Sequence, residues 1–318
     1  MKCGGLLRHH NKMAYSAFMN YREVLVTGGT GFVGTHVCRA LIARGLVPRL
    51  LVRPGSEDLV PADVRERGRI TPGDVTDRES VENAAQGTTA VVHLAGIIRE
   101  FPERKITFER LHVAATRNAV DAAVRWNIPR FVQMSALGAR AGGPTGYFDS
   151  KGRAEEYVRR SGLAWTIFRP SVIFGPGDQF ISELGRLLRV APFLPVPGDG
   201  RYSLQPVFVG DVAKGFADAI LRPGTAGREF EVGGPERLSY IELLDRIAAS
   251  IGHRARKIYV PLSFLRPAVR RLERFEKFPL TTEQLEMLLA GNTCDHRPFY
   301  TAFDFTPLSL SAYLSNRP

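Results

Sequence analysis

A glycine-rich segment near the start of the chain constrains the fold most strongly. Residues 24–26 form a short apolar run, and the following residues place Gly28, Gly31 and Gly34 directly before a helical pattern. Glycines permit a tight turn and a close approach of the backbone to a ligand, and the first turn of a helix offers unpaired N–H groups to phosphate. An ordinary glycine-rich turn has the same composition. The position between a strand and a helix nevertheless predicts a dinucleotide site.

Short apolar runs alternate with helical patterns along the first half of the chain. The apolar runs predict buried strands at 24–26, 50–52, 90–94, 131–134 and 165–168, and the intervening patterns predict helices at 32–44, 111–126 and 147–160. This alternation is typical of parallel strands joined by crossover helices. We therefore expect an α/β fold, with a doubly wound parallel sheet (a Rossmann domain) over residues 21–175.

The two ends of the chain differ from this pattern. Beyond residue 175 Pro and Gly become frequent, and helices such as 239–251 no longer alternate with strands, which predicts a smaller C-terminal lobe over 176–318. We expect this lobe to select a substrate or partner and to be interleaved with the last strands. Residues 1–20 are basic and free of acids, like an organelle transit peptide, but we favour a disordered leader or a start upstream of Met19.

The formal net charge of +11 raises the question of a nucleic-acid partner. Residues 253–277 contribute +6 of this charge, with eight Lys and Arg against Glu273 and Glu276, and the first 20 residues contribute +3. The remaining residues are nearly balanced and carry no nucleic-acid motif, so we expect no nucleic-acid partner. Cys3, Cys38 and Cys294 lack metal or disulfide spacing, which predicts no metal site and favours the reducing cytoplasm.

One position, Arg53, bears on the choice between NAD and NADP. Arg53 follows the second strand where an NAD-specific protein usually places an acid against the ribose 2′-hydroxyl. A guanidinium there can accept a 2′-phosphate, which favours NADP(H) and leaves NAD(H) open, although a solvated loop arginine is the simpler alternative. Asp74 and Val75 follow the third strand and are candidates for the adenine edge. Asp74 is equally suited to a turn or a helix cap.

The candidate catalytic residues are Ser135, at the end of the fifth strand, and Tyr147 with Lys151. A Tyr and a Lys at i and i+4 share one face of a helix, so the ammonium can lower the pKa of the phenol and make it an acid or base for a carbonyl and its alcohol. Ser135 is placed to orient the substrate oxygen. The bare Tyr-Lys spacing also arises by chance. A small-residue floor for the cofactor is expected after the fourth strand, at Leu94, Ala95 and Gly96.

Together these residues resemble the extended and atypical branches of the short-chain dehydrogenase/reductase superfamily, over roughly residues 21–318. Residues 27–34 match the TGxxGxxG loop of the extended branch, and the Ser, Tyr and Lys above match its catalytic triad. The resemblance implies a carbonyl reductase or epimerase site. It also implies that the cofactor contacts Tyr147 and Lys151. In the glycine-rich loop it implies contacts with Gly28, Thr30, Gly31, Phe32, Val33 and Gly34. After later strands the implied contacts are Arg53, Asp74, Val75, Leu94, Ala95 and Gly96, and beside the nicotinamide they are Pro170 and Val172.

A narrower resemblance points to a different role. Residues 168–178 and 292–295 are similar to the nucleotide-binding accessory subunits of respiratory complex I and their bacterial relatives. That similarity implies NADPH held for a structural or assembly role, so an accessory protein without turnover is the alternative to an enzyme. It also implies a location peripheral to the inner membrane. The substrate and the oligomeric state stay open.

The basic segment 254–277 is a candidate contact surface. Its apolar residues recur at helical spacing, at Leu262, Leu265, Val269, Leu272 and Phe275, and Arg residues fill much of the rest. A basic amphipathic helix can lie on anionic lipid or on an acidic partner of a respiratory complex. The simpler alternative is a lobe helix that buries its apolar face and leaves its basic face in solvent. Pro261 and Pro267 are expected to shorten the helix.

Overall fold

The computed structural model describes residues 23–191, 193–254, 256–276 and 278–316. The predicted leader, residues 1–20, lies outside them, as do Ala255 and Lys277 of the basic segment. The described chain is built around a sheet of seven parallel strands in the order β11-β6-β5-β4-β1-β2-β3. These strands are β1 (Glu23–Thr27), β2 (Val47–Val52), β3 (Arg69–Pro72), β4 (Ala90–His93), β5 (Arg130–Met134), β6 (Ala164–Pro170) and β11 (Arg228–Val232).

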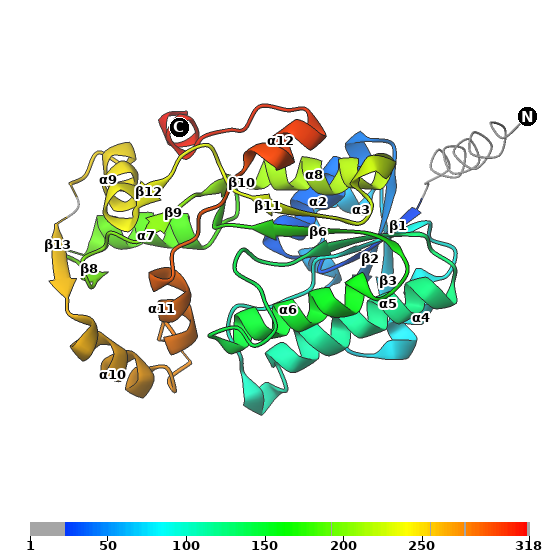
Figure 1. Ribbon diagram of the computed structural model, residues 1–318, viewed down its shortest axis with the longest axis horizontal. Helices are drawn as coiled ribbons and strands as arrows, with labels where there is room; N and C mark the ends of the chain where they lie inside the picture. Colours follow the sequence, from blue (N-terminus) through cyan, green and yellow to red (C-terminus); the bar gives the residue numbers. More distant parts are fainter. Residues whose placement is uncertain (1–22, 192, 255, 277, 317–318) are drawn as a thin grey trace, which may run out of the picture.

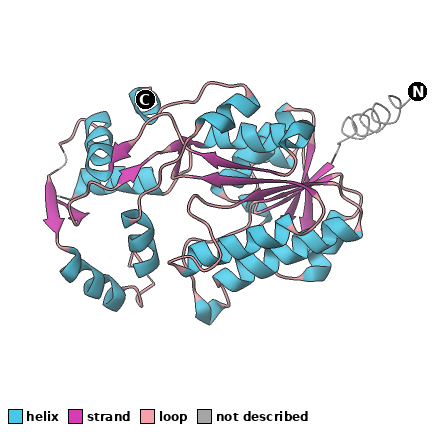
Figure 2. Cartoon of the chain, viewed as in Figure 1, coloured by secondary structure: helices cyan, strands magenta, loops and turns pink. Residues whose placement is uncertain are grey.

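Helices cover both faces of the sheet (Figures 1 and 2). One face carries α2 (Phe32–Ala43), α3 (Ala62–Arg65), α8 (Val209–Leu221) and α12 (Arg297–Phe303). The other carries α4 (Arg78–Ala85), α5 (Ala115–Arg125), which continues a π-helical turn over Glu109–Ala114, and α6 (Gly146–Arg159). Short 3₁₀ turns occupy Glu57–Leu59, Pro102–Arg104 and Pro223–Thr225.

The strand sequences explain the two layers. Side chains alternate between the faces of a strand, and in β1 Val24 and Val26 belong to the core under α2 and α8 while Leu25 belongs to the core under α4, α5 and α6. A strand buried on both sides must be apolar throughout, which is why these runs are visible in the sequence. The predicted α/β fold with a doubly wound parallel sheet is therefore confirmed.

The remaining elements form a smaller lobe with a core of its own, which includes Phe174, Leu188, Leu243 and Leu314. Three two-stranded pairings join β7 to β10, β9 to β12 and β8 to β13. The lobe contains β7 (Ile173–Phe174), α7 (Phe180–Val190), β8 (Leu194–Pro197), β9 (Ser203–Leu204), β10 (Val207–Phe208), β12 (Leu238–Ser239), α9 (Tyr240–Ser250), β13 (Lys257–Val260), α10 (Leu262–Leu272), α11 (Thr282–Leu289) and α13 (Leu310–Ser315). Between these elements the chain returns to the sheet as α8, β11 and α12. The domain boundary at residue 175 stays a prediction.

The basic segment differs from expectation in two respects. Its helix, α10, begins after Pro261 but continues through Pro267, so the expectation that Pro267 shortens it is wrong. Ser263 is exposed, so the carbonyl that lacks an N–H partner can be solvated. The predicted apolar stripe is not a buried face either: of its members Val269 is buried, whereas Leu272 and Phe275 are exposed.

Candidate functional site

The loop between β1 and α2 requires glycine at defined positions. Gly28 has a φ of +72°, and a Cβ there would lie 2.8 Å from the backbone nitrogen of Ala95. A Cβ on Gly34 would lie 2.1 Å from the carbonyl oxygen of Gly28. Gly31 is the N-cap of α2, and among the described residues no side chain caps this helix end and no acid occupies its first turn. The N–H groups therefore remain available to an anion such as a pyrophosphate.

The predicted cofactor residues follow successive strands at one edge of the sheet. Because all seven strands are parallel, the loops after their carboxyl ends lie at the same edge, and the strand order reverses between β4 and β1, where such folds bind ligands. Thr30, Phe32 and Val33 belong to the loop and first turn of α2. The loops after the other strands bring in Arg53, Asp74 and Val75, Leu94 to Gly96, Ser135, and Pro170 with Val172.

Arg53 and Asp74 differ in whether their side chains have partners within the protein. Arg53 directly follows β2 and is exposed, and in the described part of the chain its guanidinium has no hydrogen-bond or ion-pair partner. It is therefore free to meet a phosphate. Oδ1 of Asp74 accepts hydrogen bonds from the backbone N–H and the hydroxyl of Thr76, both at 2.8 Å, so Asp74 has the turn role that the sequence left open. Val75 is half-buried, and its carbonyl accepts a hydrogen bond from Asn118.

Lys151 lies where the loops after β4 and β5 meet. Its Nζ donates to the carbonyl oxygen of Met134, the residue before Ser135, at 3.3 Å. A Cβ on Gly96 would lie 2.9 Å from the same Nζ. The absence of a side chain at Gly96 therefore leaves the space that the ammonium group occupies. Gly96 was predicted to border the cofactor, and Ser135 was predicted to orient the substrate. The structure therefore brings Lys151, Gly96 and the Ser135 loop together.

Ser135 has a hydroxyl that the protein does not use. The side chain is 3% exposed, and its Oγ has no hydrogen-bond partner among the described residues. Its backbone N–H donates to the carbonyl of Phe168 at 2.7 Å, which fixes the residue at the end of β5. A buried polar atom without a partner costs free energy and is rare unless a ligand or water completes it. With the glycine cradle, this hydroxyl fits a site built for a dinucleotide and a polar substrate.

Tyr147 is buried beside a residue that the sequence did not single out, His112. The two rings pack edge to face with centroids 5.5 Å apart, and Phe108 packs against both. The backbone N–H of Ile97 lies 3.1 Å from His112 Nε2, and Nδ1 lies 2.8 Å from the hydroxyl of Ser150, which donates to the carbonyl of Tyr147. Nε2 also lies 3.0 Å from the carbonyl oxygen of Ile97, so both backbone groups of this residue meet the ring. His112 thus links the loop after β4 to the backbone of Tyr147.

Burial shifts the pKa of each titratable group in this cluster. Burial raises the pKa of Tyr147 to about 12. The expected lowering of this pKa by Lys151 is therefore not found in the protein alone, where burial is the cause of the shift. Burial lowers the pKa of Lys151 to about 8, against the opposing charge of Glu155. Burial, with the nearby charge of Lys151, lowers the pKa of His112 to about 2, so the ring is neutral.

Helix α6, which carries Tyr147 and Lys151, is held from two sides. Glu155 is buried and accepts hydrogen bonds from Arg169 on β6 and from Arg159. At the amino end, the carboxylate of Glu283 on α11 accepts hydrogen bonds from the backbone N–H groups of Gly146 and Tyr147 at 2.9 and 3.0 Å. No pattern in the sequence points to Glu283, which is more than 130 residues away from its partners.

The segment after β6 reaches toward the second lobe. The carbonyl of Pro170 accepts a hydrogen bond from the backbone N–H of Leu137, two residues beyond Ser135, at 3.0 Å. Val172 is half-buried against the lobe core, and its carbonyl accepts from Val207. The two residues therefore lie where the Ser135 loop and the lobe adjoin. Their contact with a nicotinamide stays a prediction.

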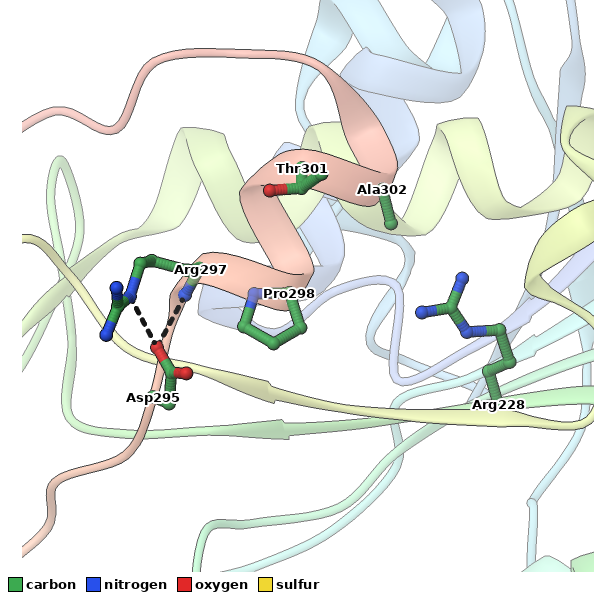
Figure 3. Close-up of a pocket in the computed structure, with 6 residues that line it drawn as sticks. All are labelled: Arg228, Asp295, Arg297, Pro298, Thr301 and Ala302. Atoms are coloured by element: carbon green, nitrogen blue, oxygen red, sulfur yellow. Dashed lines mark hydrogen bonds and ion pairs between the residues drawn. The ribbon is translucent and has the colours of Figure 1, made fainter.

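A hollow elsewhere on the surface is separate from these residues. It lies along the edge strand β11 and α12 and is lined by Arg228, Asp295, Arg297, Pro298, Thr301 and Ala302 (Figure 3). Asp295 is engaged with the backbone N–H and side chain of Arg297, as the dashed lines show. None of the predicted site residues lines this hollow. We therefore do not assign the cofactor to it.

Comparison with known proteins identifies relatives of two kinds. Residues 28–178 match the family described as NAD(P)H-binding. The chain is 30% identical over 262 residues to the mitochondrial NADH dehydrogenase [ubiquinone] 1 alpha subcomplex subunit 9 of Dictyostelium discoideum, covering 80% of this chain and 71% of the relative. It is 34% identical over 174 residues to the ceramide reductase of Caulobacter vibrioides, covering 54% of this chain and 53%, about half, of the relative.

Solved structures show the same fold. The UDP-glucose 4-epimerase of Thermus thermophilus, in complex with NAD, superposes with a TM-score of 0.64 at 24% identity, covering 75% of this chain and 86% of that one. At this identity the likeness concerns the fold alone. Together with the family match, these findings establish a pyridine-nucleotide-binding fold. They do not separate NADP from NAD.

Proposed function

The chain belongs to the extended branch of the short-chain dehydrogenase/reductase superfamily, as a relative of the alpha subcomplex subunit 9 proteins, and from this premise we propose that it is an NADP(H)-dependent carbonyl reductase. The observation that carries the proposal is the buried Ser135 hydroxyl, which lacks a partner among the described residues and follows the Met134 carbonyl that accepts a hydrogen bond from Lys151. The similarity to a ceramide reductase supports reduction as the reaction.

The roles of the side chains follow from their chemistry. A bound NAD(P)H would supply the hydride that reduces the carbonyl carbon. Tyr147, whose high pKa keeps the phenol protonated, donates its proton to the carbonyl oxygen, which becomes the hydroxyl of the product alcohol. Ser135 donates a hydrogen bond to the same oxygen. The Lys151 ammonium stabilises the resulting phenolate until solvent returns the proton.

The cofactor is held by the glycine loop and, in the proposal, by Arg53. The N–H groups at the start of α2 bind the pyrophosphate, with Gly31 allowing its close approach. The exposed Arg53 guanidinium meets the 2′-phosphate, which favours NADP(H) over NAD(H). Asp74 and Val75 border the adenine, and Leu94, Ala95 and Gly96 form the floor on the nicotinamide side.

The test is turnover. Wild-type protein is expected to oxidise NADPH with members of a ketone and aldehyde panel, and Tyr147→Phe is expected to lose at least about 100-fold in kcat, since a general acid contributes roughly 10²- to 10⁴-fold. Tyr157→Phe is the matched control, because Tyr157 lies on the same helix with its hydroxyl bonded to Asp121. Retained NADPH binding by Tyr147→Phe shows that the site is intact. Equal turnover by wild type and Tyr147→Phe overturns the proposal.

A second function is favoured by the respiratory relatives. As an accessory or assembly protein of a membrane complex, the chain would hold NADPH without turnover and contact the complex or the membrane periphery through residues 254–277. This function predicts slow exchange of a copurifying NADPH, no effect of Tyr147→Phe, and comigration with a respiratory complex. In the described part of the chain, no helix is both long and apolar enough to cross a bilayer. The membrane contact proposed here is a peripheral one.

A further inference from the structure

The segment from β13 to just beyond α10 leaves large apolar side chains in solvent. We call this set the outer face: Ile258 (49% exposed), Tyr259 (52%), Phe264 (73%), Leu272 (38%) and Phe275 (52%). On α10, Phe264 and Leu272 are exposed to solvent, while Val269 is buried and faces the protein. β13 and α10 lie at the edge of the lobe farthest from the central sheet (Figure 1). A surface of this kind indicates an interaction site.

Arginines predominate among the charges around the outer face. Arg270 and Arg271 are exposed, and neither has an acidic partner in the described part of the chain. The two acids of the segment are engaged elsewhere: Glu273 accepts a hydrogen bond from the backbone of Thr282, and Glu276 pairs with Arg104. The outer face is thus apolar and cationic, which is complementary to an anionic surface.

One helix connects the outer face to the candidate site. Helix α11 packs against α10, where Glu286 pairs with Arg266 at 2.8 Å. From the same helix, Glu283 binds the backbone of Tyr147, and Met287 packs against the cluster that contains the Tyr147 ring. Helix α11 therefore contacts both α10 and the Tyr147 cluster, and a substrate from a surface bound to α10 would pass along it to reach Tyr147.

A second connection runs from the loop after Gly96. The Arg99 side chain donates to the carbonyls of Glu273, Phe275 and Phe278, so the chain beyond α10 is fixed to this loop. Ile98, the preceding residue, is 54% exposed and adds an apolar side chain between the outer face and the site. The exposed apolar side chains therefore do not end at the lobe but approach the loop that borders Lys151.

We propose that the outer face docks on an anionic lipid bilayer and that the Tyr147 site acts on an apolar carbonyl compound taken from that bilayer. Exposed aromatic and aliphatic side chains enter the headgroup region, and the unpaired arginines meet anionic headgroups. A bilayer fits better than a folded partner because the face is a helix and a strand at the edge of the lobe, and the two acids of the segment are already engaged. The substrate class rests on the proposed function, whereas the docking does not.

Vesicle sedimentation tests the docking. Full-length protein is expected to sediment with phosphatidylglycerol-containing vesicles at low salt and to remain in solution with phosphatidylcholine vesicles. Neutralising two surface arginines, as Arg270→Gln with Arg271→Gln, is expected to weaken binding about 30-fold. Phe264→Ser is expected to weaken it as well. The matched control is Arg67→Gln with Arg160→Gln, two exposed arginines on the sheet domain, which should bind as wild type. No sedimentation by wild type, or equal binding by all variants, overturns the proposal.

A second readout separates docking from chemistry. The Arg270/Arg271 variant is expected to keep wild-type turnover of a water-soluble ketone and to lose turnover of a long-chain ketone presented in vesicles. If wild type binds vesicles but reduces neither ketone, the proposed function fails while the docking stands. If the variant reduces the vesicle-borne ketone as fast as wild type, the bilayer is not the source of the substrate and the substrate class is overturned.

Discussion

Glu283 caps the helix that presents Tyr147: its Oε2 accepts a hydrogen bond from the Tyr147 backbone N–H at 3.0 Å, and its Oε1 accepts from Gly146. Thr145, the residue directly before this helix, caps it as well: its hydroxyl oxygen accepts a hydrogen bond from the backbone N–H of Phe148. The second lobe therefore completes the amino end of α6 and sets the position of the phenol. A carboxylate at a helix amino end also interacts favourably with the helix dipole.

Loss of this cap is expected to affect both stability and turnover. Glu283→Ala should lower the free energy of unfolding by about 1 kcal/mol, because two N–H donors lose their acceptor, and it should lower kcat through displacement of Tyr147. Glu283→Gln keeps an acceptor and should cost less. Urea denaturation and NADPH oxidation measure the two effects. Glu286→Ala on the same helix removes an exposed ion pair and should change stability little; an equal loss in both alanine variants would contradict the capping role.

Arg53 is expected to distinguish NADPH from NADH. Arg53→Ala removes a charge-assisted hydrogen bond to a 2′-phosphate, so we expect the Kd for NADPH to rise about 10- to 100-fold and the Kd for NADH to stay the same. Arg67→Ala is the control, since Arg67 is also exposed but precedes β3 and so lies at the opposite edge of the sheet. Isothermal titration measures both constants. Equal losses of affinity for the two cofactors would show that Arg53 does not bind the 2′-phosphate.

Ser135→Ala is expected to separate function from folding. The Ser135 hydroxyl is buried without a partner among the described residues, so its removal should leave the free energy of unfolding unchanged or raise it by up to about 1 kcal/mol. The same change should lower kcat with a carbonyl substrate, because the substrate oxygen loses a donor. Thermal unfolding and steady-state kinetics check the two parts. A destabilised variant with normal kcat would show that the hydroxyl serves the fold.

Some of these features can be predicted well from the sequence because their causes are local. An apolar run such as Val24 to Val26 is visible wherever a strand is buried on both faces, and a glycine loop between strand and helix has a local steric reason. His112 could not be singled out, because its partners Ile97 and Ser150 come from a loop and a different helix. The exposure of Phe264 could not be predicted either, because helical spacing does not show which side of α10 packs against α11.

The pKa of Lys151 implies a pH-dependent stability. Burial lowers the folded-state pKa to about 8 from an ordinary value of 10.5, so between these pH values the unfolded chain binds more protons than the folded one. Stability must then rise with pH across this window. Relative to Lys151→Met, wild type is expected to gain up to about 3 kcal/mol across this window, measured by urea denaturation. A difference that does not change with pH would mean that Lys151 keeps an ordinary pKa.

Gly31 offers a test of the cofactor loop that leaves the fold in place. Its φ of −77° suits any residue, and a Cβ there would lie 3.3 Å from the carbonyl oxygen of Gly28, so Gly31→Ala needs only a small adjustment. The added methyl group would stand at the helix end where a pyrophosphate must approach the backbone. We therefore expect near-normal unfolding and at least about a 10-fold loss of affinity for both NADPH and NADH, in contrast to the selective loss in Arg53→Ala.

Gly224→Ala, where a Cβ meets open space, is the control for the substitution itself. Unchanged affinity in Gly31→Ala would place the pyrophosphate away from the start of α2.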